Sequence, residues 1–343
     1  MPNAVMTRAI DDLASGQHLS ADHASAVLRE VMEGRASEVE TGAFLIALRT
    51  KGETVDEVEG LARTMRELAT PVEAGADSLV DTAGTGGGTP TFNVSTAAAI
   101  VAAGAGCTVA KHGNRSATGR SGSADVIEAL GARIDLDPAA VADCIRSVGF
   151  GFMFAPAHHA AMKHVVPVRR ELAVRTIFNF LGPLTNPAGA DRQLIGVADA
   201  AYLETIAAAL ARLGSKRALV VCGADGVDEV SASGPTRAVE LRDGKLEPTT
   251  ITPEGVGVER ISRDALSGCD PDESARCIRA VLAGEDRPER AIVVVNAGAA
   301  ILVGGAADSL ADGARAAERA IDSGAAGEAL ERFIGRTKEL APA

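Results

Sequence analysis

The sequence has few aromatic residues, and this scarcity limits what the protein can bind. Its 343 residues include no tryptophan, one tyrosine and eight phenylalanines, so aromatic residues make up 3% of the chain. Proteins that bind single-stranded nucleic acid stack bases on aromatic rings. The formal net charge of −12 would also repel phosphate backbones. We therefore expect no nucleic-acid partner and a core of alanine, valine, leucine and isoleucine.

Paired cysteines and long apolar runs are also lacking. The five cysteines are dispersed and form no CxxC pair, as is typical of a reduced compartment. The longest apolar runs, 96–110 and 291–303, are short for a bilayer and rich in alanine and glycine. We interpret them as buried helices. The N-terminus also lacks a signal-peptide pattern, so we expect a cytoplasmic protein with no membrane partner.

The N-terminal block, 1–73, predicts about four short helices and no strand. Ser37 with Glu40, and Thr54 with Glu57, match the capping-box pattern that begins a helix. The apolar spacing between these two boxes predicts one buried helix face. The block therefore reads as a small all-helical domain.

The rest of the chain alternates strands with helices. Strands are predicted at 78–81, 108–111 and 217–222, and helices at 123–130, 138–148 and 199–213. This alternation is typical of an α/β domain with a mostly parallel central sheet. The last part of the chain returns to helix, and 167–187 is ambiguous because prolines bracket it. Two domains also agree with the length of 343 residues, since a domain commonly has about 100–200 residues.

A glycine-rich loop, Gly84–Gly88, lies between the first predicted strand and a helix. Its backbone N–H groups can approach an anion without obstruction by side chains. It matches neither a Walker A loop nor GxGxxG, so phosphate binding and a tight structural turn both stay open. Ser95 or Thr96 is expected to open the next helix, where a hydroxyl either caps the helix or meets a phosphate or metal-bound oxygen.

The segment Lys111–Ser116 places Lys, His, Asn and Arg at the carboxyl end of the second predicted strand. Ligands of α/β folds bind beyond the carboxyl ends of strands. A positive cluster in an acidic protein indicates an anionic ligand, the alternative being a solvated basic loop. Hydroxyls and glycines in 118–123 suggest a second phosphate cradle.

Two further clusters complete the set. The carboxylates of Asp225–Glu229 follow a predicted strand and suit a hard cation such as Mg²⁺, unless they form a solvated turn. Three arginines within 169–175 precede the proline-framed segment 178–187, which is either the wall of a pocket for an apolar carboxylate or a hinge. Together the clusters predict a doubly phosphorylated, Mg²⁺-chelated donor and a small carboxylate acceptor.

In their order along the chain, these motifs resemble those of the anthranilate phosphoribosyltransferases. The matching segments are Gly84–Gly87, Asn93–Thr96, Lys111–Ser116, Gly122–Asp125, Arg175–Asn179, Leu181–Pro187 and Asp225–Glu229. The resemblance implies transfer of the phosphoribosyl group of 5-phosphoribosyl-1-diphosphate (PRPP) to anthranilate in tryptophan biosynthesis. It also implies a fold like that of the nucleoside phosphorylases, Mg²⁺ as cofactor, and a homodimer paired through its helical domains.

The resemblance further implies domains and site residues. The helical domain would be 1–73 plus about 167–187, and the α/β domain 74–166 plus 188–343. PRPP would be held by Gly84, Gly86, Gly87, Thr91, Asn93, Val94, Ser95, Thr96, Lys111, His112, Gly113, Asn114, Arg115, Ser116, Ala117, Thr118, Gly119 and Ser123. Anthranilate would be held by Gly84, Asn114, Arg169, His112 and Pro183, with Arg169 facing its carboxylate. Mg²⁺ would meet Ser95, Asp228 and Glu229. Catalysis would rest on positioning and electrostatics, with no covalent catalyst.

The chain departs from the family pattern in three places. Gly88 stands where Asp is common, in a loop that is one residue shorter, and this predicts a change in Mg²⁺ dependence or PRPP affinity. Thr118 and Gly119 replace paired serines, which predicts the loss of one hydroxyl contact. Ala173 replaces a usual glycine.

Two other functions remain as alternatives for this fold. A nucleoside phosphorylase would use phosphate and a pyrimidine nucleoside, but it does not need a pair of carboxylates for Mg²⁺. A paralogue that binds nucleic acid is disfavoured by the acidic charge and the few aromatic residues.

Overall fold

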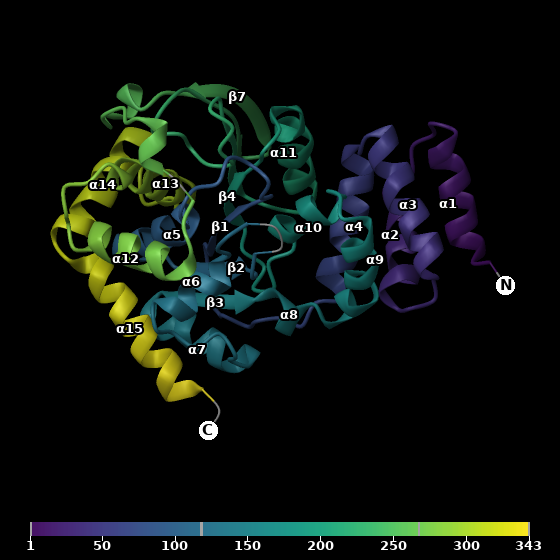
Figure 1. Ribbon diagram of the computed structural model, residues 1–343, viewed down its shortest axis with the longest axis horizontal. Helices are drawn as coiled ribbons and strands as arrows, with labels where there is room; N and C mark the ends of the chain where they lie inside the picture. Colours follow the sequence, from purple (N-terminus) through teal and green to yellow (C-terminus); the bar gives the residue numbers. More distant parts are fainter. Residues whose placement is uncertain (1, 117–118, 267, 342–343) are drawn as a thin grey trace.

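The computed structural model describes residues 2–116, 119–266 and 268–341, which form a small and a large lobe (Figure 1). The described part of the N-terminal block is helical, as predicted. Its helices are α1 (Ala4–Ala14), α2 (Ala21–Met32), α3 (Glu38–Lys51) and α4 (Val55–Glu67). Both predicted capping boxes are confirmed, and they begin α3 and α4.

The centre of the large lobe is a sheet that has seven strands in the described ranges, in the order β3-β2-β1-β4-β5-β6-β7. The strands are β1 (Val80–Gly84), β2 (Val109–Gly113), β3 (Phe150–Phe154), β4 (Arg192–Gly196), β5 (Arg217–Gly223), β6 (Thr236–Arg242) and β7 (Lys245–Ile251). Neighbours from β3 to β5 pair in parallel, whereas β6 and β7 pair antiparallel. The prediction of a mostly parallel sheet is confirmed, although β3, β4, β6 and β7 were not predicted.

The remaining helices lie around this sheet, except for α9, which lies beside the helices of the small lobe (Figure 1). They are α5 (Val94–Gly104), α6 (Ser123–Ala129), α7 (Pro138–Val148), α8 (Ala155–His158), α9 (Val166–Leu172), α10 (Phe178–Leu184), α11 (Leu203–Arg212), α12 (Pro271–Leu282), α13 (Glu289–Gly304), α14 (Leu310–Asp322) and α15 (Ala325–Leu340). Short 3₁₀ helices are η1 (Ala160–His164), η2 (Ala200–Tyr202), η3 (Glu254–Val256) and η4 (Arg263–Leu266). Among the described residues, no helix is long and apolar enough to cross a membrane.

Several predicted boundaries need correction. The run 96–110 is not one helix, because α5 ends at Gly104 and Gly106 adopts φ +96°, which turns the chain into β2. Asn93, and not Ser95, is the N-cap of α5. The predicted helix 199–213 is divided into η2 and α11. By contrast, the helix predicted at 138–148 is confirmed with both ends.

Two apolar cores lie on opposite faces of the sheet. Leu194 and Leu219 belong to the core beneath α5 and α13, whereas Ile195 and Val220 belong to the core that includes α1–α4. This alternation follows from the two-residue period of a strand. The small lobe therefore shares a continuous core with one face of the sheet.

The segment from α9 to α10 lies beside the N-terminal helices. Helix α9 contacts α3, and α10 contacts α4. Arg66 on α4 donates to the carbonyl of Leu184 at 2.7 Å. These contacts agree with the placement of 167–187 in the helical domain, and the chain division itself stays a prediction.

Candidate active site

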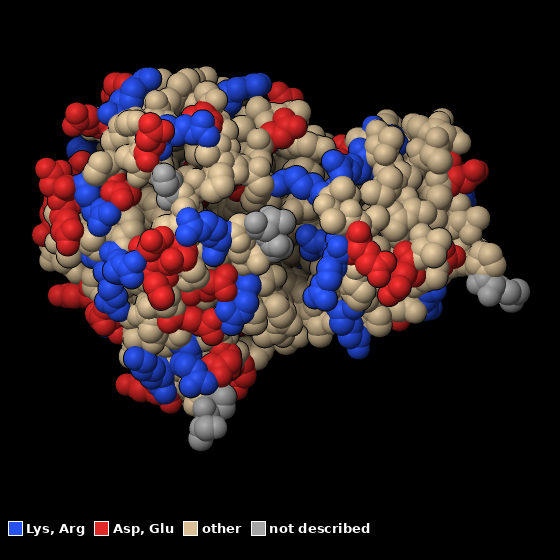
Figure 2. Space-filling model, viewed as in Figure 1, with Lys and Arg blue, Asp and Glu red and all other residues tan. Residues whose placement is uncertain are grey.

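The parallel strands end at one edge of the sheet, and four of them end in glycine. These residues are Gly84 of β1, Gly113 of β2, Gly196 of β4 and Gly223 of β5. Each predicted anion-binding or carboxylate motif lies at or after one of these ends, and Lys111 and His112 are within β2 itself. Figure 2 shows a notch between the two lobes with Lys and Arg side chains on both sides. Parallel α/β folds bind ligands at such an edge.

Asp228 lies directly against the ends of β1 and β4. Gly84 and Gly196 are register partners. A Cβ on Gly84 would be 2.6 Å from Asp228 Oδ2, and one on Gly196 would be 1.6 Å from the Asp228 carbonyl oxygen. A Cβ at Gly196 would therefore clash with the backbone, and one at Gly84 would push the Asp228 carboxylate away from the strand end. The carboxylate accepts the backbone N–H of Gly86 at 2.9 Å, which fixes it beneath the glycine-rich loop.

Glu229 provides a second carboxylate at the same place. Burial, and then the neighbouring Asp228, raises the pKa of Glu229 to about 8, while Lys111 and the Ser95 N–H oppose this rise. Burial likewise raises the pKa of Asp228. Lys111 is 1% exposed, and its Nζ lies 2.5 Å from the Thr82 carbonyl and 3.4 Å from Ser95 Oγ. The β2 lysine, the start of α5 and both carboxylates thus converge.

This donor set fits Mg²⁺. Ser95, Asp228 and Glu229 offer hard oxygen ligands, and a cation would offset the burial that raises the pKa of both carboxylates. Among the described residues, no group of three or more His, Cys, Asp and Glu side chains forms a metal site. Mg²⁺ often keeps waters and substrate phosphates as ligands. Asp225 does not join the pair, which corrects the three-carboxylate expectation, because its carboxylate accepts the Ser231 hydroxyl at 2.8 Å.

The glycine-rich loop lies close above this pair. Gly86 and Gly87 adopt φ +63° and +80°, which are left-handed conformations. A Cβ on Gly88 would be 2.8 Å from Asp228 Oδ1 and 2.8 Å from the Gly226 carbonyl oxygen. The carboxylate that the family commonly has at this position would therefore require the loop or the turn to shift.

The start of α5 is held by two serines from distant segments. The side-chain oxygen Oδ1 of Asn93 accepts hydrogen bonds from the hydroxyls of Ser121 and Ser274, both at 2.7 Å. Ser274 lies on α12, far along the chain, and no local pattern marked it as part of the site. Thr96 is fully buried, and its Oγ1 has no hydrogen-bond partner among the described residues. Val94 is buried in the core beside it.

Asp125 organises the loop that follows β2. Its Oδ2 accepts the N–H groups of Ser116 at 3.1 Å and Gly122 at 2.9 Å. Arg115 forms ion pairs with Asp125 at 2.8 Å and Glu128 at 2.5 Å. The charge of Arg115 is therefore already compensated, and its role toward PRPP stays a prediction.

Other residues of this loop are exposed or lie outside the described ranges. Asn114 is exposed, and Ser123, the first residue of α6, donates its hydroxyl to the Asn114 carbonyl at 3.3 Å. Gly119 is exposed too. Ala117 and Thr118 lie outside the described residues, so their predicted contacts have no structural account.

His112 is a residue of β2, and its side chain contacts α10. Its Nδ1 is 3.2 Å from the Gly182 carbonyl oxygen, and its ring centroid is 5.1 Å from that of His159. Burial, and then His159, lowers the pKa of His112 to about 3. The neutral ring donates from Nδ1 to Gly182, so Nε2 is an acceptor. This buried Nε2 has no partner among the described residues.

Arg169 lies on α9, and its guanidinium is 5.6 Å from the centroid of the Phe178 ring. Burial lowers its pKa. No ion pair within the described part of the chain includes Arg169, although the side chain is partly buried. Pro183 is buried within α10. An uncompensated cation thus lies beside the Phe178 ring, and its role toward an aromatic carboxylate stays a prediction.

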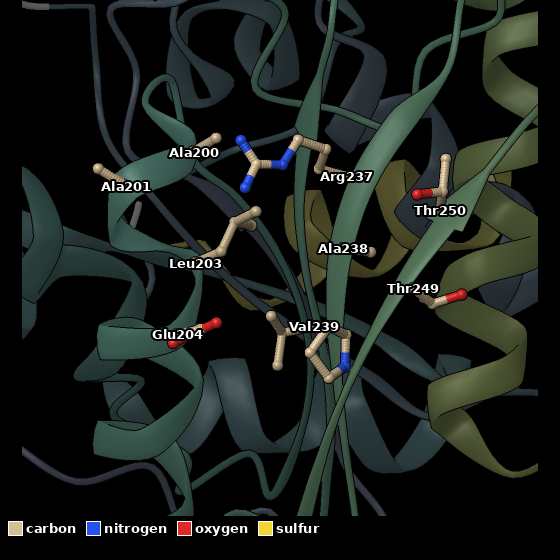
Figure 3. A pocket seen from close by; sticks show the side chains of 10 residues that line it. Ala200, Ala201, Leu203, Glu204, Arg237, Ala238, Val239, Thr249 and Thr250 are labelled. Atoms are coloured by element: carbon tan, nitrogen blue, oxygen red, sulfur yellow. The ribbon is translucent and has the colours of Figure 1, made fainter.

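A separate hollow of about 580 Å³ lies between the η2–α11 segment and strands β6 and β7 (Figure 3). Its lining includes Glu204, Arg237 and Thr250. None of the residues that line it belongs to the predicted site. The hollow is therefore not part of the active-site proposal.

Comparisons with known proteins identify the family of this chain. Residues 7–69 match the helical bundle domain of a glycosyl transferase family, and 76–327 match its α/β domain. The anthranilate phosphoribosyltransferase of Rubrobacter xylanophilus is 52% identical over 98% of this chain and 99% of its own. That of Thioalkalivibrio sulfidiphilus is 51% identical over 97% of this chain and 98% of its own.

Solved structures give the same result. The anthranilate phosphoribosyltransferase of Thermus thermophilus is 44% identical, with a TM-score of 0.91 over 96% of this chain and 99% of that one. The Saccharomyces cerevisiae enzyme in complex with PRPP and Mg is 28% identical, with a TM-score of 0.89 over 98% of this chain and 99% of that one. This chain belongs to the anthranilate phosphoribosyltransferase family.

Proposed function

We propose that this chain transfers the phosphoribosyl group of PRPP to anthranilate, giving N-(5-phosphoribosyl)anthranilate and pyrophosphate, in tryptophan biosynthesis. The observation that carries the proposal is the pairing of two surfaces at the carboxyl edge of the sheet. One is the glycine-rich loop above Asp228 and Glu229, and the other is the uncompensated Arg169 beside an apolar wall. The first suits a diphosphate donor and the second an aromatic carboxylate.

The donor site consists of backbone and hydroxyl groups. The glycine-rich loop would bind the diphosphate through N–H groups such as that of Gly87, whereas the Gly86 N–H already donates to Asp228. Ser95 and Thr96 at the start of α5 would contribute hydroxyls. The unpartnered Thr96 Oγ1 supports this assignment. Lys111 would act from beneath by orienting Ser95. Mg²⁺, when bound by Ser95, Asp228 and Glu229, would neutralise charge on the diphosphate.

The acceptor site lies toward α9 and α10. Arg169 would pair with the anthranilate carboxylate, and Pro183 would pack against its ring. The unpartnered acceptor Nε2 of His112 would take an N–H of the amine and orient it. Gly84 ends β1 and Asn114 directly follows β2, and both would lie between the two substrates.

Catalysis would follow from position and electrostatics. The bond from C1 to the leaving pyrophosphate breaks toward an oxocarbenium-like state, and preorganised N–H groups offset the charge that develops on pyrophosphate. The anthranilate amine is a neutral nucleophile and needs little base catalysis. Correct alignment of amine and C1 can supply up to about 7–11 kcal/mol of the barrier reduction.

The decisive experiment follows the loss of anthranilate fluorescence with purified protein, PRPP and a Mg²⁺ series. Loss that depends on both PRPP and Mg²⁺ is expected. Arg169→Ala should raise the KM for anthranilate more than that for PRPP, and equal changes would remove Arg169 from the acceptor site. Asp228→Asn with Glu229→Gln should shift the Mg²⁺ optimum, whereas an unchanged titration would contradict their metal role.

We also propose a homodimer that pairs through the helical domain. Val39 on α3 is 82% exposed, and Ile46 on the same helix and Val166 on the adjacent α9 are 37% and 43% exposed. Light scattering should give the mass of a dimer, and Val39→Glu should give a monomer. Leu246→Glu on the distant strand β7 is the control, because Leu246 is also 37% exposed.

We propose the cytoplasm as the compartment of this reaction. The five cysteines all lie in the described ranges and are free, which supports a reducing environment. Fractionation of the source cells with an antibody to this chain tests it, and recovery outside the cytoplasmic fraction would contradict it.

A further inference from the structure

Arg175 crosses from the α9–α10 segment to the glycine-rich loop. Its Nη1 donates to the Gly86 carbonyl oxygen, and its Nη2 lies 3.5 Å from the Thr85 carbonyl oxygen. A Cβ on Gly87 would be 1.5 Å from Nη1 and 2.7 Å from Cζ. The Nη1 end of the guanidinium therefore occupies the space that a side chain at Gly87 would need, and this contact agrees with glycine at that position.

The position of Arg175 along the chain is fixed on both sides. Ala173 ends α9 in a left-handed conformation with φ +51°. The N–H of Thr176, the residue that follows Arg175, donates to Asn179 Oδ1 at 3.0 Å. Ile177 is 1% exposed and anchors the chain in the core. The backbone on both sides of Arg175 is therefore held in place.

Arg175 also connects the elements of the two proposed substrate sites. The helix before it carries Arg169, and the helix after it carries Gly182, which accepts from His112. The loop that it bonds carries the N–H groups proposed for the diphosphate. The charge of Arg175 also acts on Asp228, where it opposes the rise in pKa caused by burial.

We infer that Arg175 is a positioning residue that holds the donor loop against the acceptor-binding segment and thereby couples the binding of the two substrates. The inference rests on the proposed function for the identity of these substrates. Coupling between two sites is reciprocal, so each substrate should tighten the binding of the other. Without the guanidinium, the loop and the acceptor segment would move independently.

The test compares Arg175→Ala and Arg175→Lys with Arg146→Ala. Arg146 is a matched control, because it also donates to a backbone carbonyl of a distant segment, that of Glu73 at 3.1 Å, but on α7. Initial rates over a grid of both substrates give both KM values and their coupling. We expect Arg175→Ala to lower kcat/KM for PRPP by about tenfold to hundredfold, as for loss of hydrogen bonds from a charged donor.

The dependence of the KM for anthranilate on PRPP distinguishes a positioning role of Arg175 from a role in stabilising the fold alone. In the unsubstituted protein and in Arg146→Ala, the KM for anthranilate should fall as PRPP saturates, and in Arg175→Ala it should not depend on PRPP. Millimolar guanidinium should partly rescue Arg175→Ala, and Arg175→Lys should retain an intermediate coupling. Unchanged KM values and coupling in Arg175→Ala, tighter PRPP binding in that variant, or no coupling in the unsubstituted protein would each overturn the inference.

If Arg175→Ala does not fold, a second set of variants tests the same contact. Gly87→Ala displaces the guanidinium and retains its charge, while Gly86→Ala has a similar positive φ but no atom within 4 Å of its Cβ. The excess defect of Gly87→Ala over Gly86→Ala measures the Arg175 contact, and equal defects would overturn the inference. Calorimetry with Mg²⁺ and pyrophosphate needs no turnover. Weaker pyrophosphate binding in Arg175→Lys but not in Arg146→Ala would support a role of Arg175 at the donor loop, even if anthranilate were not the acceptor. Unchanged pyrophosphate binding in Arg175→Lys would contradict that role.

Discussion

Replacement of Gly88 should damage the donor site in two separable ways. A Cβ at this position would approach Asp228 Oδ1 and the Gly226 carbonyl oxygen to 2.8 Å each, and the Asp228 nitrogen to 2.9 Å. Gly88→Ala must therefore shift the loop or the turn at 226–228, and either movement disturbs the hydrogen bond that the Asp228 carboxylate accepts from the Gly86 N–H at 2.9 Å. Loss of a hydrogen bond to a charged group costs about 1.5–3 kcal/mol. We expect kcat/KM for PRPP to fall about tenfold to hundredfold.

Gly88→Asp adds charge to this steric effect. Two carboxylates about 4 Å apart repel each other by about 4 kcal/mol at an effective dielectric constant of 20. A divalent cation shared between the new carboxylate and Asp228 would cancel much of this repulsion. Gly88→Asp should therefore be the weaker enzyme at low Mg²⁺ and should recover as Mg²⁺ rises, toward the activity of Gly88→Ala but not beyond it.

The assay is anthranilate fluorescence at several fixed Mg²⁺ concentrations with PRPP varied. Gly335→Ala and Gly335→Asp serve as controls, because Gly335 is exposed on α15 and a Cβ there meets no atom within 4 Å. Both controls should keep the unsubstituted kcat/KM. Wild-type activity in Gly88→Ala, or Mg²⁺ curves for the two Gly88 variants that superimpose, would refute the reasoning.

Three further predictions concern buried polar groups. Lys51→Met should lower the free energy of unfolding by about 3–5 kcal/mol, because it leaves a fully buried carboxylate without the cation that lies 2.9 Å away; an unchanged urea midpoint would contradict this. Burial holds the pKa of His112 at about 3 and that of His159 at about 4, so the unfolded chain, with a histidine pKa of about 6.5, binds more protons as the pH falls. Stability should therefore decrease below about pH 6.5, by about 2 kcal/mol for each histidine at about pH 5, and substitution of both by glutamine should flatten the profile of unfolding midpoint against pH. The side-chain amide of Asn296 forms hydrogen bonds with the N–H and the carbonyl of Val230, next to the carboxylate pair. Asn296→Leu should therefore lower kcat/KM for PRPP, measured by the fluorescence assay. It should also destabilise the fold by about 1–3 kcal/mol for each group left unpaired, measured by circular dichroism melts.

Local sequence signals predicted much of the fold. The capping boxes at the starts of α3 and α4, and the N-cap aspartate with a following proline at the start of α7, lie within a few residues of the bonds they make. Strand β7 offered no such signal, because all but the last of its residues are exposed and a proline interrupts it. It exists because β6 pairs with it. Strands without an apolar period depend on partners that lie elsewhere in the chain.

The candidate site divides in the same way. Its chemistry-bearing residues follow strand ends, and short motifs such as Lys111–Ser116 were therefore visible in the sequence. The groups that hold those motifs come from distant segments. Ser274 bonds Asn93, and Asn186 donates to Asp81 at 2.8 Å, a buried carboxylate that in turn accepts the N–H of His112 at 3.1 Å. No spacing rule relates residues that meet only when the sheet has formed.

The absence of a carboxylate at position 88 changes the charge balance of the donor loop. The resemblance leads us to expect a carboxylate at this position, but the loop has glycine there. Arg263 lies 2.8 Å from Thr89 Oγ1, and Arg175 bonds the carbonyl of Gly86. Two cations and one fewer anion around the loop favour a diphosphate even before Mg²⁺ contributes. PRPP should therefore bind measurably when Mg²⁺ is removed by a chelator, and Gly88→Asp should abolish that binding but not the binding in excess Mg²⁺. Equal dependence of both proteins on Mg²⁺ would show that the glycine serves only the close approach to Asp228.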